Sequence, residues 1–294
     1  MERERRVVTD SMLGLRLPDV SVWSERVVTV LGQNPGPFTG PGTNTYLVGT
    51  SRRPLLIDAG DGRASFPPLL RRALAEHRGG REIEALVVTH AHPDHLGGWE
   101  AVRRELGGFA IRKRPWEGRD GAAADHLEPV AEGDVIATEG ATLRAVHTPG
   151  HAEDHLCFWL EEERALFTGD LVLGAGTTVI PDEGGDLLDY LASLRRLLAL
   201  EPRRIYPAHG PRVDDATAKI RAYIAHRELR EQQVLDQLRR GVARVPEIVR
   251  GIYTDVPEFL HAAAASSIRA HLRKLEREGR AQREGEGWTL AAAP

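Results

Sequence analysis

The fold is decided by the stretch Leu86-Val-Val-Thr-His90-Ala-His92-Pro-Asp94-His95-Leu-Gly-Gly98, where an apolar run ends in three histidines and one aspartate. Residues 83–89 are apolar and rich in β-branched side chains, which predicts a strand buried on both faces. Pro93 favours the first turn of a helix, and apolar residues recur at helical spacing over residues 94–106. The polar side chains therefore belong to a strand-to-helix turn.

The four polar residues of this turn are spaced for two adjacent metal sites. Side chains alternate in direction along an extended segment, so His90 and His92 can point to the same side. The turn displaces Asp94 and His95 onto a second site. A single histidine is usually a surface or hydrogen-bonded core residue, whereas four candidate ligands within six positions favour metal binding.

Three later positions repeat the pattern of a strand followed by a polar residue beside a glycine. His151 follows Gly150, Asp170 follows Gly169 and His209 precedes Gly210. Glycine at such positions allows the backbone to approach closely. The complete prediction is a first site of His90, His92 and His151, a second site of Asp94, His95 and His209, and a bridging Asp170.

Imidazoles and carboxylates without a thiolate suit Zn²⁺ best and also permit Fe or Mn. Two ions roughly 3.5–4 Å apart can share a water, lower its pKa and stabilise both the attacking and the leaving oxygen. We therefore expect two Zn²⁺ ions and a hydrolase in which a metal-bridging hydroxide is the nucleophile.

Length and composition limit the classes of protein to which this chain can belong. The chain has 294 residues, enough for one large domain and one small one. It holds no run of about 20 apolar residues, and no apolar segment follows the charged N-terminus, so we expect a cytoplasmic protein without membrane association. Cys157 is the one cysteine, which excludes an intrachain disulfide. Of 39 basic residues only Lys113, Lys219 and Lys274 are lysine, which suggests a GC-rich genome.

The expected secondary structure falls into two domains. Over residues 1–215, short apolar strands and amphipathic helices predict an α+β fold in which helices cover two facing sheets, an αββα sandwich. Residues 216–294 continue a helix that begins at residue 214, and they predict two more helices over 245–253 and 262–279. A hairpin over 281–290 completes a domain that resembles a winged helix.

The C-terminal domain has a modest positive charge, with 14 Lys and Arg against 10 Asp and Glu over residues 216–294. One interpretation is contact with nucleic acid. The other is a cap that packs against the site or forms a homodimer, since the arginines are interleaved with Glu276 and Glu278. The small net charge favours the cap. The basic residues in question are Arg269, Arg273, Lys274, Arg277 and Arg280.

Several other segments carry recognisable motifs. They are Asn34-Pro-Gly-Pro37, Gly42-Thr-Asn-Thr-Tyr46, Thr148-Pro-Gly-His151, Gly176-Thr-Thr178, Tyr206-Pro-Ala-His-Gly-Pro211 and Ile224-Ala-His-Arg-Glu-Leu-Arg-Glu-Gln-Gln233. The His-x-His-x-Asp-His pattern alone identifies only the metallo-β-lactamase superfamily. Together these segments closely resemble the beta-lactamase-like protein 2 family over nearly the whole chain.

The resemblance implies a metallo-β-lactamase fold and a zinc-dependent hydrolase. Members in animals act as endoribonucleases on single-stranded RNA, and fungal relatives release polyketides from carrier proteins as thioesterases. It also implies that Asp94 is catalytic, accepting a proton as well as binding metal. An acidic residue at the position of Asp58 is expected to hydrogen-bond a ligand imidazole and fix its tautomer.

We rank three functions from the most to the least favoured. The first is a phosphodiesterase resembling a single-strand-specific endoribonuclease, and the alternative is an acyl-thioesterase or other ester hydrolase, acting on carrier proteins or resembling glyoxalase II. The third is a metal-binding module without catalysis, which the complete ligand set disfavours. Only 39 residues separate Asp170 from His209, too few for the inserted domain of β-CASP nucleases. The residues expected beside the ions or the substrate are Asp58, Asn44, Thr177, Thr178 and Arg212.

Seven further histidines lie outside the proposed ligand set. Four of them lie in charged helical segments and are predicted to be solvated: His77, His226, His261 and His271. His155 heads a strand and is predicted to lie in the core or behind a ligand.

Overall fold

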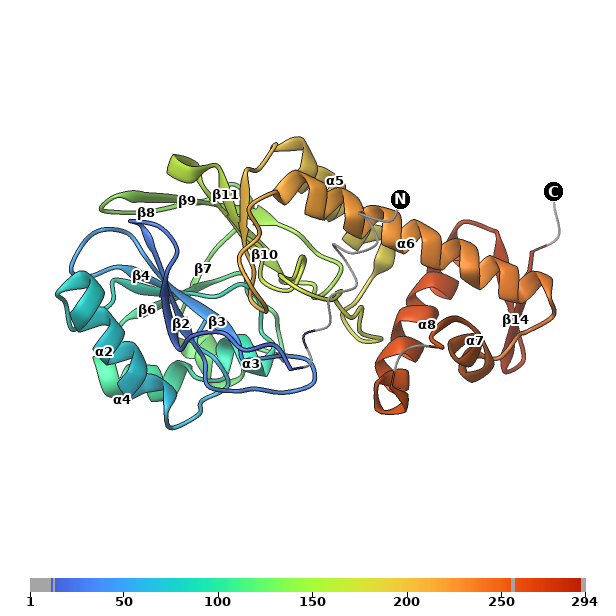
Figure 1. The fold of residues 1–294 in the computed structure, drawn as a ribbon, viewed down its shortest axis with the longest axis horizontal. Helices are drawn as coiled ribbons and strands as arrows, with labels where there is room; N and C mark the ends of the chain where they lie inside the picture. The colour runs from blue at the N-terminus through green and yellow to red at the C-terminus, as the bar shows by residue number, and fades with distance from the viewer. Residues whose placement is uncertain (1–11, 13, 255–256, 292–294) are drawn as a thin grey trace.

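Two β-sheets face each other in the larger part of the protein. The computed structural model describes residue 12, residues 14–254 and residues 257–291. Figure 1 shows the sheets on one side and a smaller helical unit on the other, with one long helix between them. The first sheet has seven strands in sequence order, and the second has five in the order β12-β11-β10-β9-β8.

The strands of the seven-stranded sheet are β1 (Val20–Val22), β2 (Val27–Leu31), β3 (Asn44–Val48), β4 (Leu55–Ile57), β5 (Ala85–Val87), β6 (Ala110–Lys113) and β7 (Leu127–Pro129). The first four strands pair antiparallel, and the pairs from β4 to β7 are parallel. Helices α2 (Phe66–Arg78), α3 (Pro93–Leu96) and α4 (Trp99–Leu106) provide the crossovers between its parallel strands. A short 3₁₀ helix, η1 (Gly121–His126), precedes β7.

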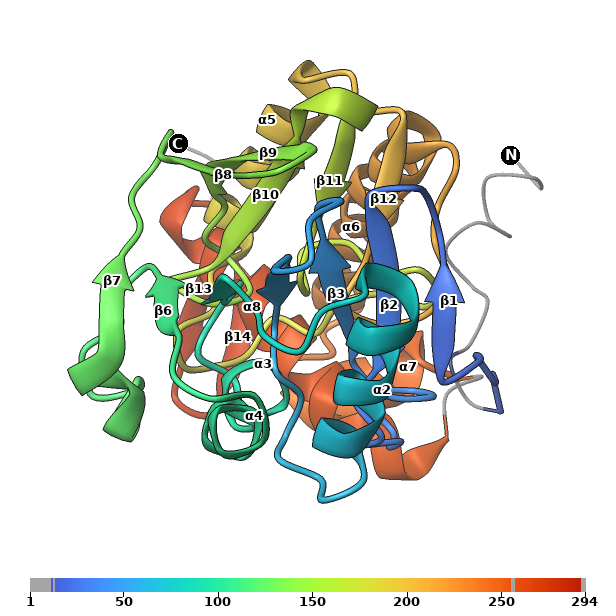
Figure 2. The same ribbon diagram turned by 90° about the vertical axis from the view of Figure 1, so that its left-hand side faces the viewer.

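The second sheet contains β8 (Val135–Thr138), β9 (Ala141–His147), β10 (Leu156–Leu160), β11 (Ala165–Phe167) and β12 (Arg204–Tyr206). A 3₁₀ turn, η2 (Glu161–Glu163), joins β10 to β11, and α5 (Leu187–Ala199) crosses between β11 and β12, which run parallel. Figure 2 shows α5 on one side of the paired sheets and α2 and α4 on the other. The predicted αββα sandwich is confirmed.

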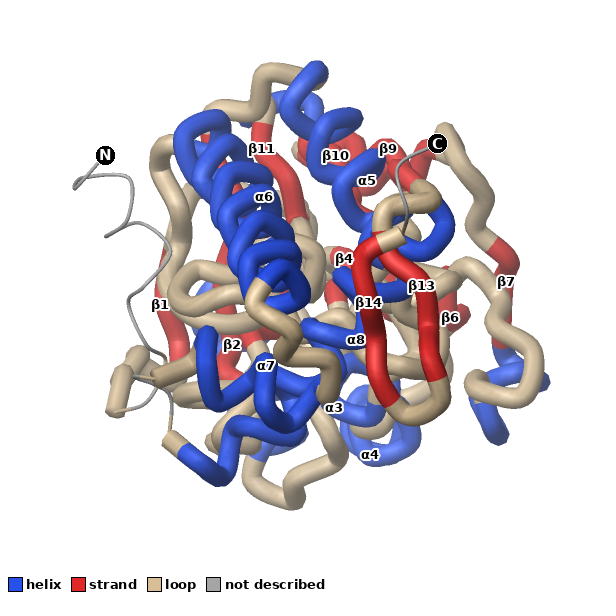
Figure 3. The backbone as a smooth tube through the Cα atoms, turned by 90° about the vertical axis from the view of Figure 1, so that its right-hand side faces the viewer, coloured by secondary structure: helices blue, strands red, loops and turns tan. Residues whose placement is uncertain are grey.

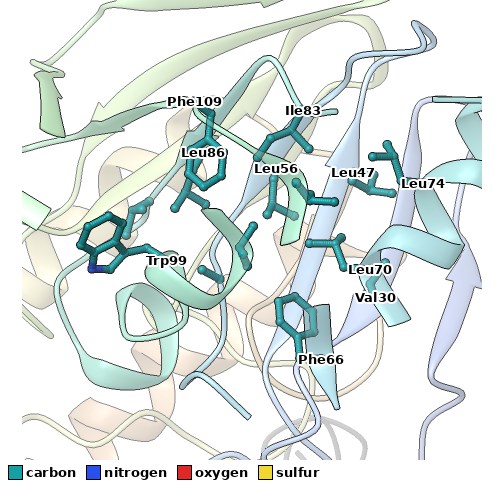
Figure 4. Close-up of a cluster of buried hydrophobic side chains, with 14 of the residues drawn as sticks. Val30, Leu47, Leu56, Phe66, Leu70, Leu74, Ile83, Leu86, Trp99 and Phe109 are labelled. Carbon is teal, nitrogen blue, oxygen red and sulfur yellow. The ribbon is translucent and has the colours of Figure 1, made fainter. Parts of the chain in front are cut away.

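Alternation along the strands explains the layers. In β3, Leu47 joins the apolar cluster under α2 and α4, whereas Tyr46 and Val48 join the cluster between the sheets. Figure 4 shows the outer cluster, in which Phe66 and Leu70 of α2 meet Val30 and Leu47 of the sheet. A third cluster packs α5 and the first half of the following helix onto the second sheet. The layers leave the strand ends free to carry polar groups.

The helix expected over residues 94–106 is interrupted, which corrects the prediction. Gly97 and Gly98 separate α3 from α4. A Cβ on Gly98 would lie 2.0 Å from the carbonyl oxygen of Ala59, so only glycine permits this approach. The Gly98 N–H also donates to the carbonyl of Gly60. The break therefore seats the ligand turn against the residues that follow β4.

The C-terminal unit consists of α6 (Ala216–Arg239), α7 (Val245–Ile252), η3 (Glu258–Leu260), α8 (His261–Arg277) and the hairpin of β13 (Ala281–Glu284) and β14 (Gly287–Leu290). The predicted hairpin is confirmed, and Figure 3 shows it lying beside α8. Within the residues that the structure describes, no helix is both long and apolar enough to cross a bilayer.

Helix α6 contributes to both parts of the molecule. Ile220 and Tyr223 pack in the cluster on the second sheet, whereas Val234 and Leu238 pack against α7 and α8. The domain boundary at residues 215/216 stays a proposal, because the helix that begins there is shared by two cores.

Candidate metal centre

The seven proposed ligands converge from four strand ends. His90 and His92 follow β5, Asp94 and His95 lie in α3, and the other three follow β9, β11 and β12. Each short strand is buried and ends where the chain turns, so the polar side chains gather at one edge of the sandwich. The structure thus brings together residues that are up to 119 positions apart, from His90 to His209.

Three histidines form the first group. The Nδ1 atom of His92 lies 2.9 Å from Nε2 of His90 and 3.0 Å from Nε2 of His151. Their ligand atoms lie within 4.8 Å of one another, close enough to hold one metal ion. Burial lowers the pKa of His92 to about 4 and that of His90 well below its ordinary value, so both imidazoles are neutral and have a lone pair for a metal.

Asp94, His95 and His209 form the second group, and Asp170 lies between the two groups. Nε2 of His209 lies 3.2 Å from Oδ2 of Asp94 and 3.1 Å from Oδ1 of Asp170. Oδ2 of Asp170 lies 3.5 Å from Nε2 of His151, so its two oxygens face different groups. Burial raises the pKa of Asp94 and Asp170, but the histidines beside them lower it further, and both carboxyl groups are ionised.

Besides their spacing, the lack of hydrogen bonds to described residues at two buried ligand atoms indicates that these side chains suit a metal ion. Nε2 of His95 and Oδ1 of Asp170 are buried and make no hydrogen bond with any described residue, although they lie 3.4 Å apart. Buried polar atoms without a partner are costly and therefore rare in native proteins. Here they point toward the other ligand atoms, as metal coordination requires.

Asp58 orients one ligand directly. Its Oδ2 accepts a hydrogen bond from Nδ1 of His95 at 2.8 Å, which leaves Nε2 facing the second group. Its carboxylate also accepts bonds from the Thr89 N–H at 2.8 Å and the Thr89 hydroxyl at 3.0 Å. Asp58 has φ +57°, a left-handed conformation that is uncommon outside glycine. The structure therefore gives Asp58 the position expected from the sequence.

Asn44 fixes the turn that carries His209. Its side-chain N–H group donates to the carbonyls of Pro207 and Gly210, and its backbone N–H donates to Ala208. The side chain is buried, so it fixes the backbone around His209.

The preceding loop adds residues that sequence reasoning missed. The hydroxyl of Thr43 lies 3.4 Å from Oδ2 of Asp94 and accepts a bond from the Asn34 side chain. The one sequence signal for this loop is its density of Gly and Pro, which favours an irregular segment.

The other proposed substrate residues differ in position. Thr178 is buried, and its hydroxyl donates to the carbonyl of Asp170, whereas Thr177 is half-buried. Arg212 lies 3.0 Å from Asp214 and donates to the carbonyl of Trp23 at 2.8 Å. Its guanidinium is therefore engaged by protein groups, with 32% of the side chain exposed.

His155 supports Asp170, the proposed bridging ligand. The Asp170 N–H donates to Nε2 of His155 at 3.2 Å, and Nδ1 of His155 lies 2.9 Å from the Thr148 hydroxyl. Because Nε2 accepts, the proton belongs on Nδ1. Burial lowers the pKa of His155 well below its ordinary value, consistent with a neutral ring.

A buried ion pair fixes the backbone between two ligands. The Lys113 ammonium is fully buried and lies 2.6 Å from both Asp120 and Asp154. Oδ2 of Asp154 also accepts the N–H of Ala91, which lies between His90 and His92. Sequence reasoning missed this group, because pairing across 41 positions leaves no local pattern.

The basic residues of α8 are paired within the protein. The Arg269 Nε lies 2.9 Å from both oxygens of Asp182, and Arg273 lies 3.0 Å from the same carboxylate. Arg277 pairs with Asp186 at 2.5 Å. Lys274 and Arg280 share Glu231 and also contact Glu278. The hydrogen bonds from Arg269 hold the pKa of Asp182 below its usual range.

The prediction of a solvated ring was wrong for His271. His271 is 1% exposed, on the face of α8 that packs against α6, and is not solvated. Helical periodicity placed it correctly on a helix, but it could not show which face of α8 is covered.

Two adjacent groups of imidazoles and carboxylates at the edge of an αββα sandwich are suited to metal-dependent hydrolysis. The chain belongs to the metallo-beta-lactamase superfamily, whose sequence profile matches residues 38–209. The profile of the beta-lactamase-associated winged helix domain matches residues 245–288, which confirms the predicted winged helix. The protein is therefore an enzyme of the metallo-β-lactamase hydrolase class.

Several curated proteins are similar over most of their length. The lactamase-like protein adaB of Aspergillus niger is 40% identical over 92% of this chain and 86% of that protein. The beta-lactamase-like protein 2 homolog of Caenorhabditis elegans is 38% identical over 87% and 86%. The atrochrysone carboxyl ACP thioesterase of Aspergillus fumigatus is 41% identical over 82% and 78%. The resemblance to the beta-lactamase-like protein 2 family is thereby confirmed.

Solved structures share the fold. A beta-lactamase domain protein from Burkholderia ambifaria superposes with a TM-score of 0.78, at 21% identity, over 96% of this chain and 97% of that one. A second protein, crystallised in a di-iron-bound form, is 31% identical over 64% of this chain and 95% of that one, with a TM-score of 0.50.

Proposed function

We propose that this protein hydrolyses acyl thioesters with two zinc ions held by His90, His92, His151, Asp94, His95, His209 and Asp170. The observation that carries the proposal is the convergence of these side chains into two adjacent groups with Asp170 between them. Two divalent ions would supply an activated water and stabilise the charge that develops on the substrate. The donor set suits zinc, and the relative with two irons makes iron the alternative.

The protein's own residues have distinct roles in this proposal. Asp58 fixes the tautomer of His95 through the 2.8 Å bond to Nδ1. Asp94 is ionised and, at 25% exposed, is the most exposed side chain of the second group, so it can accept a proton during hydrolysis. The Thr43 hydroxyl, which accepts a bond from Asn34, donates to that carboxylate.

The ranking of substrates differs from the one that the sequence favours. A thioester needs no cation beside the metal ions, because a thiolate is a good leaving group. A phosphodiester also needs its phosphate neutralised, and Arg212 and the α8 arginines are already engaged with carboxylates. A relative that is 41% identical is named a carrier-protein thioesterase. These observations favour the thioester over single-stranded RNA.

The test is a comparison of substrates under one metal condition. The protein would be incubated with a panel of acyl thioesters, with single-stranded RNA and with lactoylglutathione. Thioester turnover at least a hundredfold above that of a metal-free control, with RNA left intact, is the expected result. RNA cleavage beside inert thioesters would reverse the proposal.

A further inference from the structure

The segment that follows Asp170 lies against three of the proposed ligands. Residues 171–180, here called the ligand loop, run from the end of β11 toward α5. The Thr178 hydroxyl donates to the carbonyl of Asp170, and the Val179 carbonyl accepts from Nδ1 of His151 at 2.8 Å. The Gly174 N–H donates to the carbonyl of His209 at 2.7 Å. The conformation of the ligand loop therefore bears on ligands from three different strand ends.

One face of α6 contacts this loop along its length. Lys219, Tyr223 and Arg227 follow one another at intervals of four residues, so they lie in a row on the helix surface. All three are buried, with at most 3% of each residue exposed. We refer to them as the α6 row. Such a row is ordinarily apolar on a helix that packs against a core, and here it carries two cations and a hydroxyl.

Each residue of the row bonds to the backbone of a successive part of the loop. The Lys219 ammonium donates to Gly174 O at 3.2 Å. The Tyr223 hydroxyl accepts the Leu173 N–H at 3.0 Å and donates to Gly176 O at 2.9 Å. The Arg227 guanidinium donates to Thr178 O at 2.5 Å and lies over the ring of Tyr190, 5.1 Å from its centroid.

We propose that Lys219, Tyr223 and Arg227 are positioning residues of the metal centre. They satisfy backbone groups of an irregular buried segment and so fix one conformation of the ligand loop. In that conformation Thr178 bonds to the carbonyl of Asp170, and the Val179 carbonyl accepts a bond from His151, so both ligands are oriented. Apolar side chains of similar size would fill the same space but could not hold these backbone groups. The winged-helix unit is thereby connected to the metal centre through α6.

This inference rests on the metal centre of the proposed function but not on its substrate. The experiment therefore measures metal binding directly. Apoprotein would be titrated with Co²⁺ and Zn²⁺ against a competing chelator, and the visible spectrum of the Co²⁺ form would report the geometry of coordination. The variants are Arg227→Met, which keeps an unbranched side chain but loses the donors, and Tyr223→Phe, which keeps size but loses the hydroxyl.

Partners that orient metal ligands typically change metal affinity by about 10- to 100-fold. We expect a loss of this size in Arg227→Met and Tyr223→Phe, together with an altered Co²⁺ spectrum. Arg227→Lys, which keeps one donor and the charge, should recover part of the affinity. The matched control is Arg230→Met, because Arg230 lies on the same helix but stacks on Tyr253, 4.5 Å from its ring centroid, and should bind metal like the wild type.

Wild-type metal affinity and spectrum in both Arg227→Met and Tyr223→Phe would overturn the inference. If Arg227→Met fails to fold, Tyr223→Phe decides, and wild-type metal binding in that variant overturns the inference equally. Failure to hydrolyse thioesters would leave the metal titrations unchanged, so the two proposals can fail separately.

Discussion

The metal centre and the basic face of α8 both gather charged or polar side chains, but the arginines of α8 each pair with a carboxylate, whereas some ligand atoms of the metal centre make no hydrogen bond with a described residue. In the metal centre, buried atoms such as His95 Nε2 and Asp170 Oδ1 make no hydrogen bond with a described residue. On α8, by contrast, Arg269, Arg273 and Arg277 each have a carboxylate partner. Buried lone pairs without a hydrogen bond suit a metal ion, whereas arginines paired with carboxylates hold the protein together.

Removing Asp94 should have the largest effect, because it is expected both to hold a metal ion and to accept a proton. We expect Asp94→Ala to lower turnover by about 10²–10⁴-fold. Asp94→Asn should keep some metal while losing the proton acceptor. The control is Asp182→Asn on the paired face, which should change turnover little. Steady-state kinetics with metal analysis measures both, and equal losses in Asp94→Ala and Asp182→Asn would erase the distinction between the two regions.

Truncation after residue 215 should be the next largest effect. Ala216, Ile220 and Tyr223 belong to the apolar cluster on the second sheet. At about 25 cal/mol per Å², exposing a few hundred Å² of apolar surface costs several kcal/mol, comparable to the stability of a domain. The 1–215 fragment should aggregate or lose metal. A soluble and fully active fragment in sedimentation and activity assays would contradict a supporting role for the C-terminal unit, while its part in a homodimer stays a prediction.

Reversing the α8 charges should have a small effect on catalysis. Exposed ion pairs typically contribute up to about 1 kcal/mol each. We expect the triple variant Arg269→Glu, Arg273→Glu and Arg277→Glu to keep thioester turnover within about two-fold and to leave RNA affinity unchanged. If the variant instead lost RNA binding and showed a flatter salt dependence, α8 would be a nucleic-acid surface.

The smallest expected effect is that of acid on the C-terminal unit. Lowering the pH should destabilise this unit through His271. Burial lowers the pKa of this ring well below its ordinary value, and the groups that face it are Arg227, Lys274, His226 and Arg230. The unfolded chain takes up a proton near pH 6.5 that the folded chain cannot, so stability falls as the pH drops below that value, by up to about 1.4 kcal/mol per unit. His271→Phe should remove this slope.

Urea unfolding at pH 7.5 and pH 5.5 measures the contribution of His271. Metal loss at low pH affects wild type and variant alike, so the difference between them isolates the ring. An identical loss of stability in both would show that His271 does not titrate on unfolding.

Features that depend on neighbouring residues could be predicted from the sequence, whereas features that depend on residues far apart in the chain could not. His90 to His95 and the glycines beside His151, Asp170 and His209 could be located, because strand ends and turn residues leave local patterns. The break at Gly97–Gly98 could not, since it depends on contact with Ala59, 39 positions earlier.

Local sequence patterns likewise could not predict ion pairs between residues that are far apart in the chain. Arg269 and Asp182 are 87 positions apart, and nothing near either residue indicates the other. The three lysines illustrate the same point. Lys113, Lys219 and Lys274 are all buried, although composition alone suggested only a genomic bias. Their ammonium groups donate to carboxylates or backbone carbonyls that the fold brings to them.

The most direct test of the central claim is the number of transition-metal ions per chain, followed together with thioester hydrolysis during chelation and metal re-addition. The account predicts close to two ions in the active protein, loss of hydrolysis as they are removed, and recovery when zinc is restored. A metal-free protein that hydrolyses its substrate at the full rate would contradict it.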